Sequence, residues 1–354
     1  MDLVSSDVLF TVVIVLTIGY AFINGFHDAG LSVGNAVASS SVHPRLALIV
    51  AAVFNFIGAL LGQGVAESVA VALVEFPPVE NTVLLVLAAG VFAALVWNIT
   101  TYLVAVPVSS THCLFGGIIG AALVFGVVTD AGLVFWTLIA PVFLLPVVAL
   151  VIAYAASRIT TRVLASHAPK PLFRHSRFAN NVLSASLGLA HGVQDAQKVG
   201  VVMMIAILAH TDPAGISHDE LGIAWPVRIL IAVALGLGTF FSGWRMVRTV
   251  SVRMVTMGEP VKATVADAVS AGFLFVAAFL LRLPVSMSYL VIASNIGTEL
   301  GTPRPHVRGR FLIPVVAVAA TALFVTGLLG AAVAVPLFLL HRAAVATEPL
   351  LLLH

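Results

Sequence analysis

The sequence predicts an all-α, polytopic membrane protein made of two inverted-topology repeats, with broken helices or re-entrant hairpins and about ten membrane-crossing segments. Two observations lead to this prediction. The 354 residues are 60% hydrophobic and only 9% charged, with a mean hydropathy of +1.13, whereas a soluble domain has roughly 25% charged residues. In addition, two short sequence motifs each occur once in either half of the chain.

The first motif places an aspartate inside an apolar segment of each half. Residues 24–29 read Asn-Gly-Phe-His-Asp-Ala, and residues 191–196 read His-Gly-Val-Gln-Asp-Ala. The second motif is Val-Pro-Val-Ser-Ser-Thr-His at 106–112, which returns as Leu-Pro-Val-Ser-Met-Ser-Tyr at 283–289. Two polar segments per half, interrupted by Gly or Pro and embedded in a membrane, are typical of a binding site at the midplane of a transporter.

Hydropathy divides the chain into ten candidate crossings, since a spanning helix needs about 20 apolar residues. They are 8–38, 46–66, 82–104, 105–126, 132–157, 180–208, 225–247, 262–282, 283–300 and 311–341. The first is long and interrupted by glycines, and the fourth and ninth are short and rich in Pro, Ser and Gly, which favours hairpins or broken helices. Five crossings per half is an odd number, so the halves have opposite orientation. We expect a first repeat at 1–157, a basic linker at 158–179 and a second repeat at 180–354.

The charged residues predict the orientation. The ten crossings place most basic residues on one side of the membrane: Arg45, Arg158, Arg162, Lys170, Arg174, Arg177, Arg245, Arg248, Arg253, Lys262, Arg304, Arg308 and Arg310. The opposite connections hold Glu67, Glu75, Glu80, Asp130, Asp212, Asp219 and Glu220. By the positive-inside rule the basic side, including the central linker, is cytoplasmic, and both termini lie outside. We expect a multi-pass protein of the cell inner (plasma) membrane whose partners are the lipid bilayer and a small solute, not nucleic acid.

Four ionisable residues fall within the predicted crossings, namely Asp28, Asp195, Lys198 and Asp267. An intramembrane charge costs several kcal/mol and usually faces a cavity or a partner. Lys198 follows Asp195 by one helical turn, so the two could pair, either within a binding site or as a structural ion pair. Asp267 lies near the end of a crossing, where we expect a packing or interfacial role.

Glycines flank both repeated aspartates. They are Gly25, Gly30 and Gly34 around the first, and Gly188, Gly192 and Gly200 around the second. Because glycine lowers helix propensity, we expect local unwinding at both places. Unwinding would free backbone carbonyls for a cation and backbone amides for an anion.

The Pro-Ser motif predicts an anion site. Pro107 suits the first turn of a new helix, and a helix N-terminus offers free amides and the positive end of a dipole. Hydroxyls both donate and accept, so they suit an oxyanion that carries a proton. The candidate hydroxyls of the two copies are Ser109, Ser110, Thr111, Ser286 and Ser288. Hydrogen bonds between transmembrane helices are the alternative role for such residues, and their recurrence at matching places makes it the weaker one.

Two histidines are candidates for carrying protons, because an unperturbed histidine has a pKa of about 6.5. His27 directly precedes Asp28, and His112 ends the first Pro-Ser motif at the position that Tyr289 takes in the second. Packing residues with satisfied hydrogen bonds are the alternative interpretation of both. The single cysteine, Cys113, excludes an intrachain disulfide.

Together these motifs resemble the PiT family of inorganic phosphate transporters. Residues 25–28 and 192–195 are similar to the family's Gly-Ala-Asn-Asp motif, and Ala196-Gln197-Lys198 continues like the family's own run. Residues 106–112 resemble its Pro-Val-Ser-Thr-Thr-His hairpin, and 243–249 its Gly-Trp-Arg-Ile segment. The resemblance covers most of the chain in the right order, and the short central loop is similar to that of bacterial members.

The resemblance implies phosphate uptake with sodium or protons, or as a metal–phosphate complex, and also a homo-oligomer. It implies that phosphate is surrounded by the two motif aspartates and the hairpin hydroxyls: Asp28, Ser109, Ser110, Thr111, Asp195, Ser286 and Ser288. The chain departs from the family pattern at several positions, namely His27, Leu31, Gln194, Met287 and Tyr289. Asparagine supplies oxygen to hard cations, whereas imidazole carries protons, so the loss of the motif asparagines favours H+ over Na+ as the coupling ion. The candidate residues for a coupling ion or proton are His27, Asp28, Gln194, Asp195, Lys198 and His112; no metal ligand set is predicted.

The sequence therefore predicts a secondary active transporter, a symporter of inorganic phosphate coupled to protons or another cation, with the anion bound at the midplane. Two carboxylates repel a dianion unless protons or cations neutralise them. Sulfate or another oxyanion is the alternative substrate, although sulfate has no proton to donate to Asp28 or Asp195.

Two other classes of function are left as alternatives. A cation exchanger or channel would use Asp28 and Asp195 as ion ligands. An intramembrane hydrolase would use Ser109 or Ser110 with His112 and Asp28, but no Gly-x-Ser-x-Gly elbow surrounds these serines. We predict no enzyme activity and no cofactor.

Overall fold

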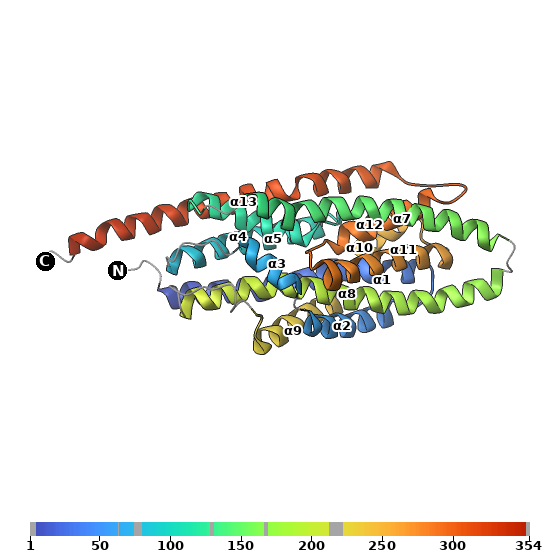
Figure 1. Cartoon of the computed structure of the whole chain (residues 1–354), viewed down its shortest axis with the longest axis horizontal. Coiled ribbons are helices and arrows are strands. Elements are labelled where there is room, and N and C mark those ends of the chain that lie inside the picture. The colour runs from blue at the N-terminus through green and yellow to red at the C-terminus, as the bar shows by residue number, and fades with distance from the viewer. Residues whose placement is uncertain are drawn as a thin grey trace.

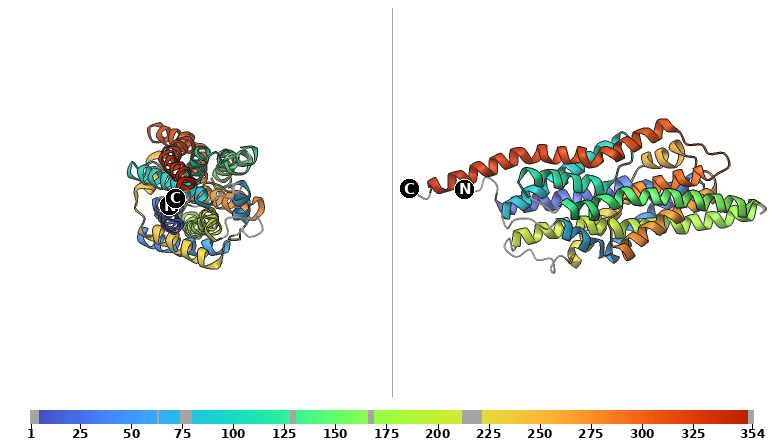
Figure 2. Two further views of the ribbon diagram at one scale, coloured as in Figure 1. Left: turned by 90° about the vertical axis from the view of Figure 1, so that its left-hand side faces the viewer. Right: turned by 45° about the horizontal axis from the view of Figure 1, so that its top comes forward.

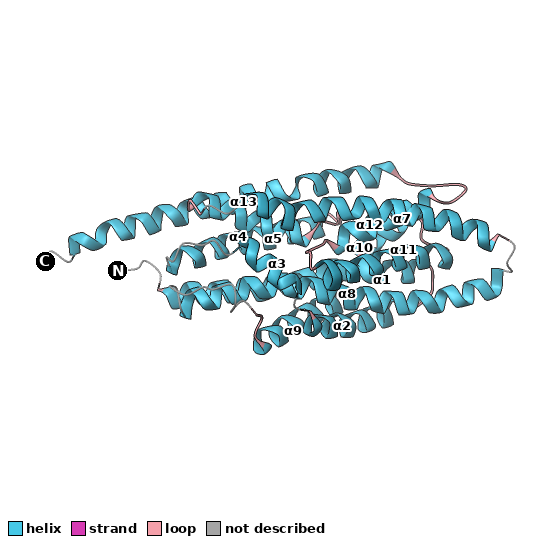
Figure 3. Ribbon diagram, in the orientation of Figure 1, coloured by secondary structure: helices cyan, strands magenta, loops and turns pink. Residues whose placement is uncertain are grey.

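The computed structural model describes residues 5–62, 64–73, 80–127, 131–165, 169–211 and 222–351. These residues fold into helices joined by short connections, with no strand among them (Figure 3). Most helices run along one long axis, and both chain termini lie at the same end of the bundle (Figure 1). The prediction of an all-α, polytopic membrane protein is confirmed.

Each half contributes a similar succession of helices. The first half contains α1 (Ser6–Ala38), α2 (Pro44–Leu61), α3 (Gly64–Leu73), α4 (Glu80–Leu103), α5 (Ser110–Val124), α6 (Ala131–Val134), the π-helical η1 (Phe135–Ile139) and α7 (Ala140–Leu164). The second contains α8 (Pro169–Thr211), α9 (Trp225–Phe241), α10 (Arg245–Val247), the π-helical η3 (Arg248–Met254), α11 (Pro260–Phe275), the π-helical η4 (Val276–Leu281), α12 (Met287–Leu300) and α13 (Gly309–Leu351).

Seven of the described helical segments are long and apolar enough to cross a membrane, or eight if α9 and the α10–η3 segment, bent by 65°, form one span. The sequence predicted ten. The difference lies mainly in α5 and α12, which have 15 and 14 residues. At 1.5 Å per residue each is about 20 Å long, less than the roughly 30 Å of a bilayer's hydrocarbon core. The short Pro/Ser-rich segments are therefore short helices that do not span alone.

The predicted unwinding around the repeated aspartates is wrong. Both α1 and α8 continue as helices through Asp28 and Asp195. The glycines instead allow close helix packing: a Cβ built on Gly25 would lie 2.2 Å from a backbone oxygen of α9, and one on Gly192 would lie 2.1 Å from a backbone oxygen of α2. Small residues at helix interfaces are common in membrane proteins because they let backbones approach.

The helix contacts of the first half match those of the second, both within each half and between the halves. α1 packs against α9 and α4, while α8 packs against α2 and α11. α5 packs against α4 and α13, while α12 packs against α11 and α7. The end-on view shows α1 and α8 side by side inside the bundle (Figure 2). The two motif aspartates, one on each of these helices, are thereby brought into the protein interior.

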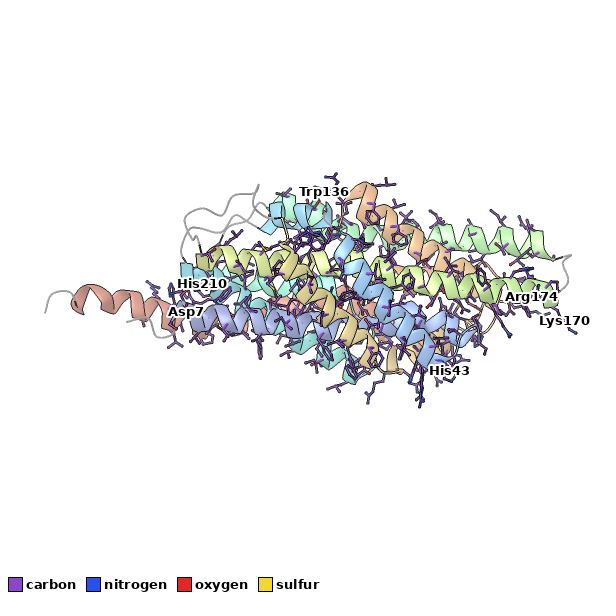
Figure 4. All side chains as sticks on the ribbon, turned by 90° about the horizontal axis from the view of Figure 1, so that it is seen from below. Asp7, His43, Trp136, Lys170, Arg174 and His210 are labelled. Carbon is purple, nitrogen blue, oxygen red and sulfur yellow. The ribbon has the colours of Figure 1, made fainter. Side chains whose placement is uncertain are left out.

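The segment predicted as a linker, 158–179, is mostly helical, since α7 ends at Leu164 and α8 begins at Pro169. Lys170 and Arg174 lie at the opposite end of the molecule from Asp7 and His210 (Figure 4). Several acidic residues used to predict the orientation lie outside the described residues: Glu75, Asp130, Asp212, Asp219 and Glu220.

Candidate functional site

The repeated aspartates lie together in the core. Asp28 on α1 and Asp195 on α8 are 2% and 3% exposed. The Nε2 atom of His191 lies 3.2 Å from Asp195 Oδ2 and 3.9 Å from Asp28 Oδ2. One oxygen of each carboxylate and one nitrogen of this histidine lie within 4.8 Å of one another. The centre of the site is thus two carboxylates with an imidazole between them.

Asp195 is held by a buried cation. Lys198 Nζ lies 2.7 Å from Asp195 Oδ1, and Asn24 Nδ2 donates to Asp195 Oδ2 at 2.9 Å. The ammonium of Lys198 also donates to Thr111 Oγ1 at 2.8 Å and to the carbonyl oxygen of Val285 at 2.6 Å. Lys198 is only 2% exposed, so it links α8 to the start of α5 and to the segment before α12.

Asp28 receives hydroxyls from both short helices. Ser288 Oγ donates to Asp28 Oδ1 at 3.0 Å, and Ser110 Oγ donates to Asp28 Oδ2 at 3.3 Å. His27 Nδ1 lies 2.7 Å from Asp28 Oδ1, and its Nε2 lies 3.4 Å from Thr101 Oγ1. Three of the five candidate hydroxyls, those of Ser110, Thr111 and Ser288, therefore contact the charged centre.

The other two candidate hydroxyls have a different role. Ser109 Oγ accepts a hydrogen bond from the backbone N–H of His112 at 3.2 Å, and Ser286 Oγ accepts from that of Tyr289 at 3.4 Å. Each is the N-cap of its helix, a position that serine favours because its side chain satisfies an unpaired amide. These serines shape the helix starts that carry the contacting hydroxyls.

Gln194 and His112 lie beside the centre without contacting the aspartates. Gln194 Nε2 donates to the carbonyl oxygen of Leu283 at 3.3 Å, and its Oε1 accepts from the N–H of Val285 at 3.3 Å. It thus anchors the segment that leads into α12. His112, fully buried, places Nδ1 3.4 Å from the hydroxyl of Tyr289.

Sequence reasoning missed three side chains of the site. Asn24 and His191 each precede a motif aspartate by four residues, one helical turn, and that spacing in both copies is the signal that could have found them. Asn98 on α4 is fully buried; its Oδ1 accepts from Ser110 Oγ at 3.4 Å, while its Nδ2 has no hydrogen-bond partner among the described residues. A polar residue in an apolar crossing was the only sequence signal for it.

The assembled groups suit an oxyanion. The N-termini of α5 and α12 supply hydroxyl donors and the positive ends of helix dipoles. Lys198 supplies an ammonium, and Asn98 an amide donor without a partner. Asp28, His191 and Asp195 also have the geometry of a three-ligand metal group, but the ammonium of Lys198 already lies against one carboxylate of that group.

The chain matches the phosphate transporter family over residues 24–176 and 167–330. It is 32% identical over 296 residues to a Bacillus subtilis protein named "Probable low-affinity inorganic phosphate transporter", covering 82% of this chain and 85% of that one. A protein of the same name from Mycobacterium bovis is 32% identical over 309 residues, covering 85% of this chain and 70% of that one.

A solved structure described as "The sodium-dependent phosphate transporter" has the same fold. It superposes with a TM-score of 0.74 at 18% identity, over 94% of this chain and 99% of that chain. The family and the relatives are transporters, which removes the hydrolase alternative. This chain therefore belongs to the phosphate transporter family and is a transport protein, not an enzyme.

Proposed function

We propose that this protein is a symporter that carries inorganic phosphate across the membrane together with a cation. The observation that carries the proposal is the convergence of two hydroxyl-bearing helix starts on one buried charged centre. Thr111 at the start of α5 contacts Lys198, and Ser288 at the start of α12 contacts Asp28. Each half thus presents an anion-binding helix terminus to the charged residue of the other half.

Phosphate suits this centre better than sulfate does. The lysine, the hydroxyls and the free amide of Asn98 donate to phosphate oxygens, but Asp28 can only accept while it is ionised. Monohydrogen phosphate has one O–H to donate to that carboxylate, and sulfate near neutrality has none. A buried carboxylate left facing an oxygen without a proton would be strongly unfavourable.

Charge balance accounts for coupling to a cation. Asp28, Asp195 and Lys198 together carry one net negative charge when the neighbouring histidines are neutral. Adding a dianion to this closed, buried centre raises the negative charge further, and unpaired charge in such surroundings is costly. Phosphate therefore binds well only when cations or protons bind with it.

Protons are our preferred coupling ion because an imidazole lies against each carboxylate. His27 contacts Asp28, and His191 contacts Asp195, and histidine can take up a proton near neutral pH. The structural relative is described as sodium-dependent, which makes sodium the competing coupling ion to be tested beside the proton.

We further propose that the two halves are inverted repeats with both termini outside. Three observations support the repeat: the matched packing of the helices, the shared N-caps, and the left-handed backbone of Ala105 and Arg282, with φ of 57° and 53°, two residues before Pro107 and Pro284. The outward placement of the termini rests on the distribution of the basic residues. Residues 1–157 and 180–354 would be the repeats. A homo-oligomer is implied only by the family resemblance. Measuring the mass of the purified protein in detergent tests it.

The test is uptake of labelled phosphate and labelled sulfate into liposomes that contain the purified protein. Each anion is offered with and without sodium, and with and without an inward proton gradient. We expect concentrative phosphate uptake driven by a cation gradient, and loss of that uptake in Asp28→Asn and Asp195→Asn. Thr17→Val is a matched control, since Thr17 is buried in α1 and, among the described residues, its hydroxyl bonds only to the carbonyl oxygen of Val13 in the same helix. Unchanged uptake in both aspartate variants would remove the proposed site.

A cation exchanger is the competing function, favoured by the three-ligand group of Asp28, His191 and Asp195. It predicts metal-ion flux that does not require phosphate. The same liposomes, loaded with a fluorescent metal indicator and tested without phosphate or sulfate, distinguish the two functions.

A further inference from the structure

A pocket of about 580 Å³ lies at the end of the bundle that carries Lys170 and Arg174 (Figure 4). Its walls come from the end of α7, the start of α8, the start of α11 and the connection from α12 to α13. Figure 1 shows the turn from α7 to α8 and the α12–α13 connection at the same end of the molecule. None of the residues assigned to the phosphate site lines this pocket. Ligand pockets have roughly 300–1,000 Å³, so this one is large enough for an organic ligand.

The pocket lies at the level of the lipid headgroups. The candidate span Pro260–Leu281 has 22 residues, which at 1.5 Å per residue is about 33 Å, close to the roughly 30 Å of the hydrocarbon core. Its first turn lines the pocket and is therefore at the membrane surface. The connection after α12 leads to the same level, because Thr302 follows Ser288 by 14 residues and so lies about 20 Å from the proposed midplane site.

Three charged side chains line the pocket. Arg304 is exposed and forms no ion pair with any described residue, Lys262 is half-buried, and Glu259 is exposed. Lys262 Nζ lies 3.3 Å from Glu299 Oε2, which leaves further N–H donors on the ammonium. Glu299 is 2% exposed and also accepts from the N–H of His306 at 2.9 Å, so its carboxylate is satisfied inside the protein.

The surroundings of the pocket add positive charge. The end of α7 and the start of α8 carry five basic residues and no acidic one among the described residues: Arg158, Arg162, Lys170, Arg174 and Arg177. Basic connections face the cytoplasm, and the cytoplasmic leaflet carries anionic lipids that attract such segments. The pocket is thus open to an anionic group at the side of the membrane where such lipids lie.

The first turn of α11 supplies uncapped amides to the same wall. α11 begins at Pro260, and the side chain of its N-cap residue, Glu259, makes no capping hydrogen bond. Val261 and Lys262, the second and third residues of the helix, therefore keep N–H groups that a capping side chain would otherwise take. Both residues line the pocket. These amides and the two cationic side chains together suit a phosphate group.

Much of the remaining lining is apolar. Leu164, Leu172 and Val265 are half-buried, and Phe173 is 38% exposed. A free phosphate ion would leave these side chains facing water. The glycerol and the first acyl methylenes of a phospholipid would cover them, and covering apolar surface is favourable.

We propose that this pocket binds the headgroup of an anionic phospholipid. The phosphodiester lies against Lys262, Arg304 and the start of α11, and the glycerol and upper acyl chains lie against the apolar wall. Basic pockets between transmembrane helices on the cytoplasmic side are typical of such lipid sites. The bound lipid contacts α7, α8, α11 and the α12–α13 connection at once, so it stabilises their arrangement. The inference goes beyond the proposed function and does not depend on which solute is carried.

The experiment measures lipid binding to the purified full-length protein in a nonionic detergent without phosphate. Anionic phosphatidylglycerol and zwitterionic phosphatidylcholine of equal chain length are titrated separately while the melting temperature is recorded. A ligand that binds only the folded state raises the melting temperature. We expect a saturable rise with phosphatidylglycerol and a much smaller one with phosphatidylcholine. Equal rises would overturn the proposal.

Arg304→Gln tests the cationic part of the pocket, and the exposed position of Arg304 means that the fold should not be disturbed. It should raise the half-saturating concentration of phosphatidylglycerol roughly tenfold, the value of one hydrogen bond to a charged group. Arg162→Gln is the matched control, since Arg162 is exposed at the same end of the molecule but does not line the pocket. An equal change in both variants would assign the effect to general attraction by the basic surface and contradict the proposal.

Filling the pocket is a second test, which keeps every charge. Thr161 is exposed in the lining, and among the described residues its hydroxyl bonds only to the carbonyl oxygen of Ser157 in the same helix. Thr161→Trp should abolish the rise with phosphatidylglycerol. Val163→Trp should keep it, because Val163 is 61% exposed on the same helix but lies outside the lining. A wild-type rise in Thr161→Trp would exclude the pocket as the lipid site.

Soluble phosphate compounds are the competing occupants. Glycerol 3-phosphate and inorganic phosphate are titrated into the wild-type protein and Arg304→Gln in the same way. We expect any rise that they cause to be equal in the two proteins, as it is when binding occurs away from Arg304. A rise that requires Arg304, at concentrations similar to those of phosphatidylglycerol, would show that the pocket takes a soluble phosphate group and not a lipid.

Discussion

His112 and Tyr289 hold the same position in two short helices, and their side chains meet, with His112 Nδ1 3.4 Å from the Tyr289 hydroxyl. Contact between counterparts is expected beside the pseudo-twofold axis of an inverted repeat. The same exchange occurs at the neighbouring pair, where Thr111 contacts Lys198 of the second half and Ser288 contacts Asp28 of the first. The proposed anion site therefore contains residues of both halves, and neither half can form it alone.

Neighbouring serines at the start of α5 should have separable effects. Ser109 caps the helix, so Ser109→Ala should lower the free energy of unfolding by about 1 kcal/mol, with little change in KM for phosphate. Ser110 contacts Asp28 and Asn98, so Ser110→Ala should raise KM roughly tenfold, the value of one hydrogen bond to a charged ligand. Thermal unfolding in detergent and phosphate uptake in liposomes measure the two effects. If both variants lost stability and affinity for phosphate to the same extent, Ser109 and Ser110 would not have distinct roles.

Removing Lys198 should destabilise the protein as well as stop transport. Lys198→Met keeps the volume but leaves Asp195 buried without its cation, and breaking a buried ion pair from one side costs about 3–5 kcal/mol. Unfolding by SDS titration measures the loss.

The double variant Lys198→Met with Asp195→Asn is the control for that prediction. It removes both charges, so much of the lost stability should return, because an uncompensated buried charge is the main penalty. Transport should stay absent, since both groups belong to the proposed anion site. Restored transport in the double variant would mean that the pair is only structural.

The site could be predicted from the sequence to the extent that it is repeated. Asp28, Asp195, Thr111 and Ser288 stand out because matching residues recur in both halves. The glycines were misinterpreted because helix propensity is a weak preference that tertiary packing overrides. Gly25 and Gly192 instead allow close contacts between helices. Such contacts depend on a neighbouring helix that is remote in sequence.

The buried, hydrogen-bonded cluster of Asn35, Asp267 and Asn295 could not be predicted in the same way. Asn35, Asp267 and Asn295 come from three helices and belong to no repeated motif. Each alone is a polar residue in an apolar segment, for which a packing role is the usual interpretation. Their connection appears only when α1, α11 and α12 are brought together.

Two glycines of α1 provide a matched test of helix packing. A Cβ on Gly25 would lie 2.2 Å from the carbonyl oxygen of Leu235, whereas a Cβ on Gly19 would meet nothing within 4 Å. Gly25→Ala should therefore force α1 and α9 apart and lower the melting temperature. Gly19→Ala should leave the melting temperature unchanged or raise it, because alanine is better than glycine in a helix by about 1 kcal/mol. Similar melting temperatures for the two variants would contradict the close contact between these helices.

Surface labelling should reveal the orientation of the bundle. Asp7, whose side chain is 87% exposed, and the exposed Lys170 lie at opposite ends of the molecule (Figure 4). The single cysteine, Cys113, is fully buried, so the wild-type protein provides an unlabelled background. Because basic connections face the cytoplasm, Asp7→Cys should react with a membrane-impermeant maleimide on intact cells.

Lys170→Cys should react with the same reagent only after the cells are permeabilised. The Asp7 substitution removes a surface contact with His210, at 3.3 Å, and exposed ion pairs contribute little, so the fold should not be disturbed. The reverse labelling pattern would invert the orientation while keeping the fold. Labelling of both positions on intact cells would be incompatible with ends on opposite sides of the membrane, and hence with the odd number of crossings per half on which the inverted repeat depends.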